Sequence, residues 1–98
     1  GDLFLEQERQ FSRYHFEESD PEMLAVHFND HEREGKELVG KGLVFPAYDS
    51  VMKCSHLFNL LEARGALSVT EREQYIGRVR GIARRVMKAY IEMQEPAK

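Results

Sequence analysis

The sequence predicts an all-α fold: a small antiparallel bundle of about four helices, formed by residues 1–98 as a single domain. Apolar residues recur at steps of three and four along most of the chain, whereas the alternation typical of β-strands is nowhere sustained. Proline and glycine interrupt this pattern at Pro21, at 40–42 and at Gly65, which leaves four segments of helical length. A chain of 98 residues suits one domain with one core.

The first helix is expected from about Leu3 to Glu17, with Asp2 as its N-cap. Its apolar side chains recur on one side, so we expect them to be buried against the other helices. The residues expected to be buried are Phe4, Phe11, Tyr14 and Phe16.

The second helix should begin at Pro21, because Asp20 is a good N-cap and proline suits the first helical position. It should end at the turn 40–42. One face is marked by steps of four, three, four and three residues, at Leu24, Phe28, His31, Gly35 and Leu38. A glycine costs a helix about 1 kcal/mol relative to alanine, and we expect Gly35 to permit the close approach of another helix.

The third helix is expected to start at Pro46 and to stop at Gly65, which supplies the left-handed residue that often follows a helix. Its apolar face is broad, so it should contact two neighbours. The expected stripe comprises Tyr48, Val51, Met52, Ser55, Phe58 and Asn59, widened by Cys54, Leu57 and Leu61.

The fourth helix is expected from about Val69 to Met93. Ser68 and Thr70 each precede a glutamate by three residues, so either could form a reciprocal capping box. The inward side is expected to carry Ile76, Val79, Ile82, Ala83, Val86, Tyr90 and Ile91.

The segment FNLLEARGALSVTEREQYIGRVR at 58–80, with FPAYD at 45–49 and YHFE at 14–17, resembles the C-terminal portion of the alpha subunit of bacterial tetrameric glycyl-tRNA synthetase. The similarity runs from Gly1 to about Tyr90, and His15, His31 and Gly35 depart from the family pattern. The resemblance implies a parent ligase that activates glycine with ATP and magnesium and transfers it to tRNA-Gly. Its implied partners are a beta subunit and a second alpha subunit. The class II catalytic domain should lie upstream, so no catalytic, cofactor or metal residue is assigned to this chain.

Charge is distributed unevenly. Residues 1–50 carry a balance of −7 and residues 51–98 one of +4. No apolar run reaches the roughly 18 residues of a membrane span, and no signal peptide opens the chain. The single cysteine, Cys54, fits a reducing compartment such as the cytoplasm. The start at Gly1, without methionine, suggests a piece of a longer protein.

Basic residues on the fourth helix are the candidate site for tRNA or subunit contact: Arg78, Arg80, Arg84, Arg85 and Lys88. Arg80, Arg84 and Lys88 share one ridge at four-residue spacing, which could bind phosphates. The alternative is a solvated face or ion pairs to the acidic first two helices, and no aromatic stacking platform accompanies the arginines.

Two other patterns imitate functional motifs. His27 and His31 are one helical turn apart, but no third ligand joins them, so packed or surface histidines are the better interpretation. Residues 35–42 imitate a phosphate-binding loop, but Gly42 stands where a hydroxyl should bind magnesium. We therefore expect a helix end and a turn there.

Two functions remain open. The chain could be a helical structural domain of the synthetase, contacting subunits or tRNA and inactive alone. Alternatively, it could be an independent helical module that binds RNA or protein. The second possibility depends on the basic residues of the fourth helix and on apolar residues that an isolated domain would leave exposed, among them Phe4, Leu5, Phe45 and Tyr48.

Overall fold

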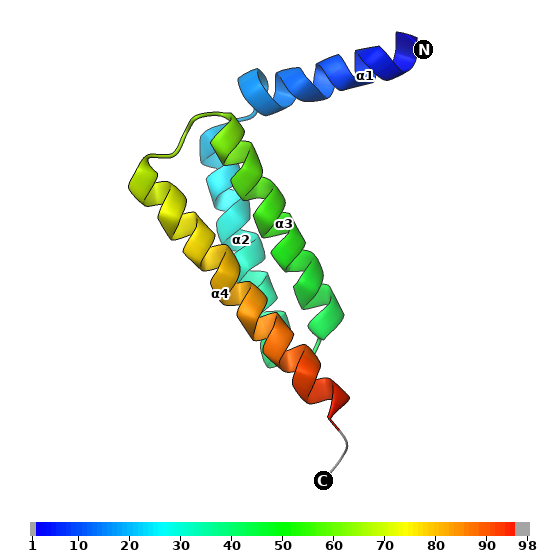
Figure 1. Ribbon diagram of the computed structural model, residues 1–98, viewed down its shortest axis with the longest axis vertical. Helices are drawn as coiled ribbons and strands as arrows, with labels where there is room; N and C mark the ends of the chain where they lie inside the picture. Colours follow the sequence, from blue (N-terminus) through cyan, green and yellow to red (C-terminus); the bar gives the residue numbers. More distant parts are fainter. Residues whose placement is uncertain (1, 96–98) are drawn as a thin grey trace.

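Helices make up almost all of the computed structural model, which describes residues 2–95 (Figure 1). No strand occurs in that range, and the helices pack as a small bundle, so the all-α prediction is confirmed. The elements are α1 (Asp2–Arg13), a π-helical turn η1 (Tyr14–Glu18), α2 (Pro21–Gly40), α3 (Val44–Ala63) and α4 (Val69–Gln94).

Three helices, α2, α3 and α4, lie side by side, whereas α1 projects away from one end of them (Figure 1). The expectation that the first predicted helix, which corresponds to α1 and η1, buries its aromatic residues is wrong. Phe4, Phe11, Tyr14 and Phe16 remain between 42% and 62% exposed. Of α1 and η1, only η1 contacts the three-helix bundle, and it does so through α3. The guanidinium of Arg64 holds this junction together by donating to the backbone oxygens of Phe16 (2.8 Å) and Ser19 (2.9 Å).

The predicted helix ends are largely confirmed. The Asp20 carboxylate accepts from the backbone N–H of Glu22 at 2.9 Å, with Pro21 as the first helical residue. The capping box of α4 is the Ser68 pair, with both hydrogen bonds to Glu71 at 3.1 Å, whereas Thr70 lies inside the first turn.

The glycine after α3 has the left-handed conformation that was expected, with φ +66° at Gly65. The start of α3 is earlier than predicted, at Val44, because proline is tolerated in a first helical turn and Pro46 lies within it.

Two apolar clusters form the core. One joins α2 to the C-terminal half of α3 and consists of Leu24, Phe28, Cys54, Leu57, Leu60 and Leu61. The other joins the N-terminal half of α3 to α4 and consists of Val44, Ala47, Val51, Ile82 and Val86. The predicted stripe of α3 is partly wrong, because Tyr48 and Met52 are more than half exposed. Ile91, predicted to face inward on α4, is also exposed.

Gly35 lies where three helices meet. A Cβ atom at this position would lie 2.5 Å from Cδ1 of Ile82 on α4 and 3.0 Å from Cβ of Ser50 on α3. These distances are shorter than normal van der Waals contact, so the expected close approach at Gly35 is confirmed.

Candidate partner-binding surface

Arg78, one of the five predicted contact residues, links α4 to α2. Its guanidinium donates to the two carboxylate oxygens of Glu32 at 3.0 and 2.8 Å and to Oδ1 of Asn29 at 2.6 Å. It also lies over the rings of Phe28 and Tyr75, at 4.6 and 5.2 Å from their centroids. A charged group with this many partners is positioned to stabilise the bundle.

This ion pair shifts the titration of both groups. The hydrogen bond from Arg78 holds the pKa of Glu32 below its ordinary value of 4.5, and the Glu32 carboxylate raises the pKa of Arg78. The side chains of Arg78 and Glu32 are 36% and 14% exposed, so water only partly screens their attraction.

Replacing Arg78 with alanine should lower the free energy of unfolding by about 2 kcal/mol at pH 7, because Glu32 would keep its charge without its main partner. The native pKa of Glu32 lies below its unfolded value, so this stabilisation is present above about pH 4.5 and is lost as the pH falls further. Urea denaturation from pH 7 to 3 should therefore show the two proteins converging in acid. A constant difference would contradict an electrostatic role.

The other four basic residues of the candidate site, Arg80, Arg84, Arg85 and Lys88, are exposed. None of them forms an ion pair with any residue between 2 and 95. The alternative interpretation had two forms: ion pairs to the acidic first two helices describe Arg78, and a solvated face describes these four residues. We call these four residues the basic ridge. Their charges face solvent and are free to meet an anionic partner.

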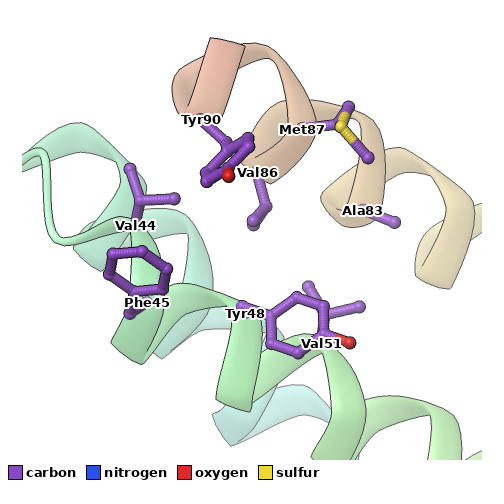
Figure 2. Close-up of a pocket in the computed structure, with 8 residues that line it drawn as sticks. All are labelled: Val44, Phe45, Tyr48, Val51, Ala83, Val86, Met87 and Tyr90. Carbon is purple, nitrogen blue, oxygen red and sulfur yellow. The ribbon is translucent and has the colours of Figure 1, made fainter. Parts of the chain in front are cut away.

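An apolar groove of about 390 Å³ lies between α3 and α4 (Figure 2). It is lined by Val44, Phe45, Tyr48, Val51, Ala83, Val86, Met87 and Tyr90. Phe45, Tyr48 and Met87 are between 56% and 67% exposed. Two residues of the basic ridge border the groove, since Met87 also contributes to a shallow depression lined by Arg84, Lys88, Ile91, Glu92 and Glu95.

Sequence reasoning found only part of this groove. Phe45 and Leu5 are exposed, as the hypothesis of an independent module required. The same hypothesis listed Tyr48 and Phe4, which are also exposed, although the helical periodicity had placed both on buried faces. Met87 was not singled out. The sequence pattern that could have identified Met87 is its spacing on α4. Ile91 is four residues after it and Arg84 is three residues before it, so the apolar pair Met87 and Ile91 lies beside the basic ridge.

The family model described as glycyl-tRNA synthetase alpha subunit matches residues 1–95. The chain belongs to the glycyl-tRNA synthetase alpha subunit family. The predicted resemblance is therefore confirmed. The family consists of ligases, and an alpha subunit is one component of a synthetase complex.

The motif-like residues of this glycyl-tRNA synthetase chain occupy structural positions. Residues 35–40 belong to α2, which is followed by a turn with φ +75° at Gly42, so the predicted helix end and turn are confirmed. His27 is exposed and His31 is half-buried on the same helix. Between residues 2 and 95 no three His, Cys, Asp or Glu side chains gather as a metal site.

Cys54 lies in the core and is fully buried. Its thiol donates to the backbone oxygen of Phe28 at 3.8 Å, and burial raises its pKa to about 11. The thiol is therefore protonated at neutral pH and is a poor nucleophile. Separately, between residues 2 and 95 no helix has the length and hydropathy required to cross a membrane.

Proposed function

We propose that this chain is the C-terminal helical domain of a glycyl-tRNA synthetase alpha subunit and that it supplies binding surfaces to the enzyme. The complete enzyme would activate glycine with ATP and magnesium and transfer it to tRNA-Gly in the cytoplasm. A class II catalytic domain outside residues 1–98 would perform the chemistry.

The observation that carries the proposal is the combination of a tight core with two solvent-exposed apolar surfaces. One surface is the aromatic side of α1, which projects from the bundle (Figure 1). The other is the α3–α4 groove (Figure 2). Exposed apolar patches of this kind are typical of interaction sites. We assign the surface of α1 to the body of the alpha subunit, or to a second alpha subunit, and the groove to the beta subunit.

The five groups with shifted pKa values support the proposal that this domain supplies contacts. Glu32 and Arg78 neutralise one another, and Cys54 is enclosed in the core. The pKa of Glu71 is lowered by its hydrogen bonds in the capping box, and that of Lys53 is raised by its hydrogen bond with Asp49. These arrangements serve packing rather than acid–base or nucleophilic catalysis.

Binding to the beta subunit tests the subunit-contact role. The purified chain, titrated with purified beta subunit in a calorimeter, should form a saturable complex. Absence of binding at concentrations up to about 100 μM, where only interactions weaker than about 5 kcal/mol escape detection, would contradict this role.

A second candidate function is an independent RNA-binding module. The basic ridge favours it, because its four charges have no ion-pair partner within the described range of residues 2 to 95. Titrating tRNA at two salt concentrations separates the candidates, because each neutralised phosphate steepens the salt dependence. Micromolar affinity that falls steeply with salt and is lost in Arg80→Glu/Arg84→Glu would favour the RNA module. We expect no such binding. The matched control is Arg33→Glu/Lys36→Glu on α2, which makes the same charge change away from the ridge.

A further inference from the structure

Helix α1 is joined to the rest of the molecule at one narrow junction. Within residues 2–95 it contacts none of the helices α2, α3 and α4, and its continuation η1 contacts only α3 (Figure 1). Its 12 residues, at a rise of 1.5 Å each, make a rod about 18 Å long. The direction of this rod is therefore set by the few residues at its base.

Two residues in extended conformation separate the rod from α2. Ser19 has φ −64° and ψ 141°, and Asp20 has φ −90° and ψ 111°. The helical hydrogen bonds stop on either side of them. The N–H of Ser19 donates to the oxygen of Tyr14, and the N–H of Leu24 donates to the oxygen of Asp20, both at 2.9 Å. Neither bond links one helix to the other, so rotation about the backbone between Ser19 and Asp20 would turn α1 without breaking either helix. We call these two residues the hinge.

The side chain of Arg64 connects the bundle to both the rod and the hinge. Arg64 follows the last residue of α3, and its Nη1 donates to the backbone oxygen of Phe16 at 2.8 Å. Its Nε donates to the backbone oxygen of Ser19 at 2.9 Å. The last carbonyl groups of a helix have no partner in that helix, and Arg64 supplies one to Phe16. Because a guanidinium presents its donors in a rigid, planar fork, the two bonds together fix an orientation.

The turn at the base of the rod, η1, is a π-helix, a rare conformation that is frequent at functional sites. The bond from Ser19 to Tyr14 spans five residues, so the turn holds one residue more than an α-helical turn. One residue corresponds to a rotation of about 100° around a helix axis. Conversion of η1 to an α-helical turn would therefore rotate the aromatic side of α1 relative to the bundle.

The rings of His15 and His56 also meet across the junction. Their centroids are 6.3 Å apart and the rings lie edge to face, at 74°. His56 is exposed and His15 is half-buried, so either ring can leave this contact by a rotamer change. The hydrogen bonds from Arg64 act on the backbone itself and come from a charged donor, which makes them the stronger constraint on the direction of α1.

We infer that Arg64 is a positioning residue that holds a hinge at Ser19 and Asp20, and that α1 swings relative to the bundle when these two hydrogen bonds open. Both bonds belong to one side chain, so they are lost together. The inference goes beyond the proposed function, because it concerns the orientation of α1 and requires no partner. In an enzyme whose other parts hold α1, the hinge would set the direction in which the bundle is presented.

Distances between two spin labels, measured by pulsed electron paramagnetic resonance, test the hinge. The labels are attached through Gln7→Cys on α1 and Lys36→Cys on α2, both at exposed positions, whereas Cys54 is fully buried and should take no label. With Arg64 in place, the labelled chain should give one narrow distance distribution. Arg64→Met keeps the length of the side chain but removes its donors, and it should at least double the width of the distribution. Equal widths with and without Arg64 would overturn the inference.

Arg72→Met is the matched control. Arg72 also lies close to the turn between α3 and α4, but its guanidinium bonds to Glu62 instead of to the hinge. This variant should leave the distance distribution unchanged. His56→Ala removes the ring contact and keeps both hydrogen bonds, so it should also leave the distribution unchanged. If His56→Ala broadens the distribution and Arg64→Met does not, ring packing holds α1 and the inference is wrong.

Two measurements separate motion at the hinge from unfolding. A label pair within the bundle, Lys36→Cys and Lys88→Cys, should keep its distance distribution when Arg64→Met is added. In the unaltered chain, the Nε proton of Arg64 should exchange with water at least tenfold more slowly than that of the exposed Arg84 in NMR spectra, because it is hydrogen-bonded. Equal exchange rates would overturn the inference without any substitution, and this measurement decides if Arg64→Met disturbs the bundle.

The failure of this inference is distinguishable from that of the proposed function, because every measurement uses the chain alone. If the hinge measurements fail and the chain binds the beta subunit, the inference is overturned while the proposed function stands. If the chain does not bind the beta subunit and Arg64→Met broadens the distribution as expected, the proposed contact fails and the inference stands.

Discussion

Replacing Phe28 with alanine should lower the free energy of unfolding by about 4 kcal/mol, the largest effect that we expect from any single substitution in this chain. Phe28 is fully buried, its ring meets that of Tyr75 edge to face at 4.8 Å, and Arg78 covers it at 4.6 Å. The substitution would therefore leave a cavity between α2 and α4 and remove the surface on which Arg78 rests. In a domain of ordinary stability, 5–15 kcal/mol in total, such a loss approaches complete unfolding.

Urea denaturation followed by circular dichroism measures this effect. Phe11→Ala is the matched control, because Phe11 is 55% exposed on α1 and its truncation should change stability by less than about 0.5 kcal/mol. Similar losses from the two substitutions would show that α1 shares the core of the bundle and would contradict the structure.

Replacing Gly35 with valine should cost about 3 kcal/mol, because the new side chain would overlap Ile82 and Ser50. The added Cβ lies only 2.5 Å from a methyl group that can rotate but also 3.0 Å from Cβ of Ser50, which is fixed to the backbone of α3. Relief therefore requires α2 and α3 to move apart, which would disturb the packing along both helices.

Gly77→Val is the control for this prediction. Gly77 is also in the middle of a helix, but no atom lies within 4 Å of the position its Cβ would take. Valine has a higher helix propensity than glycine, so this variant should be stabilised by a few tenths of a kcal/mol. Thermal unfolding should shift downward for position 35 and slightly upward for position 77. Equal shifts would mean that helix propensity alone governs both glycines.

The features predicted correctly from the sequence are those that depend on neighbouring residues. A cap needs only the few residues around it, so Asp20 and Gly65 could be identified without knowing what the helices contact. The same is true of the core face of α2. Its apolar residues repeat regularly, and three of the five, Leu24, Phe28 and Gly35, are buried.

The errors arose where the sequence shows that a side chain is apolar but not what covers it. The aromatic residues of α1 have the pattern of a core helix, and the same pattern suits a helix whose partner lies outside the described residues. In α3, apolar residues surround so much of the helix that periodicity could not separate buried Cys54 from exposed Tyr48. Both failures fall on the surfaces to which we assign binding.

Spacing also could not separate Arg78 from the basic ridge. Arg78 and Arg80 are only two residues apart and equally charged. What distinguishes them is Glu32, a residue 46 positions earlier that meets Arg78 only after α2 and α4 have packed. Ion pairs between distant segments depend on the fold. Coordinates were therefore required to separate one structural arginine from four basic residues that have no ion-pair partner between residues 2 and 95.

Glycine-dependent exchange between ATP and pyrophosphate tests the central claim most directly, namely that residues 1–98 provide contacts while the reaction centre lies elsewhere in the enzyme. The purified chain should give no exchange above background with ATP, magnesium and glycine, either alone or with the beta subunit added. A complete glycyl-tRNA synthetase measured in parallel should give robust exchange. Robust glycine-dependent exchange by the purified chain alone would contradict the account, because these helices would then contain an active site.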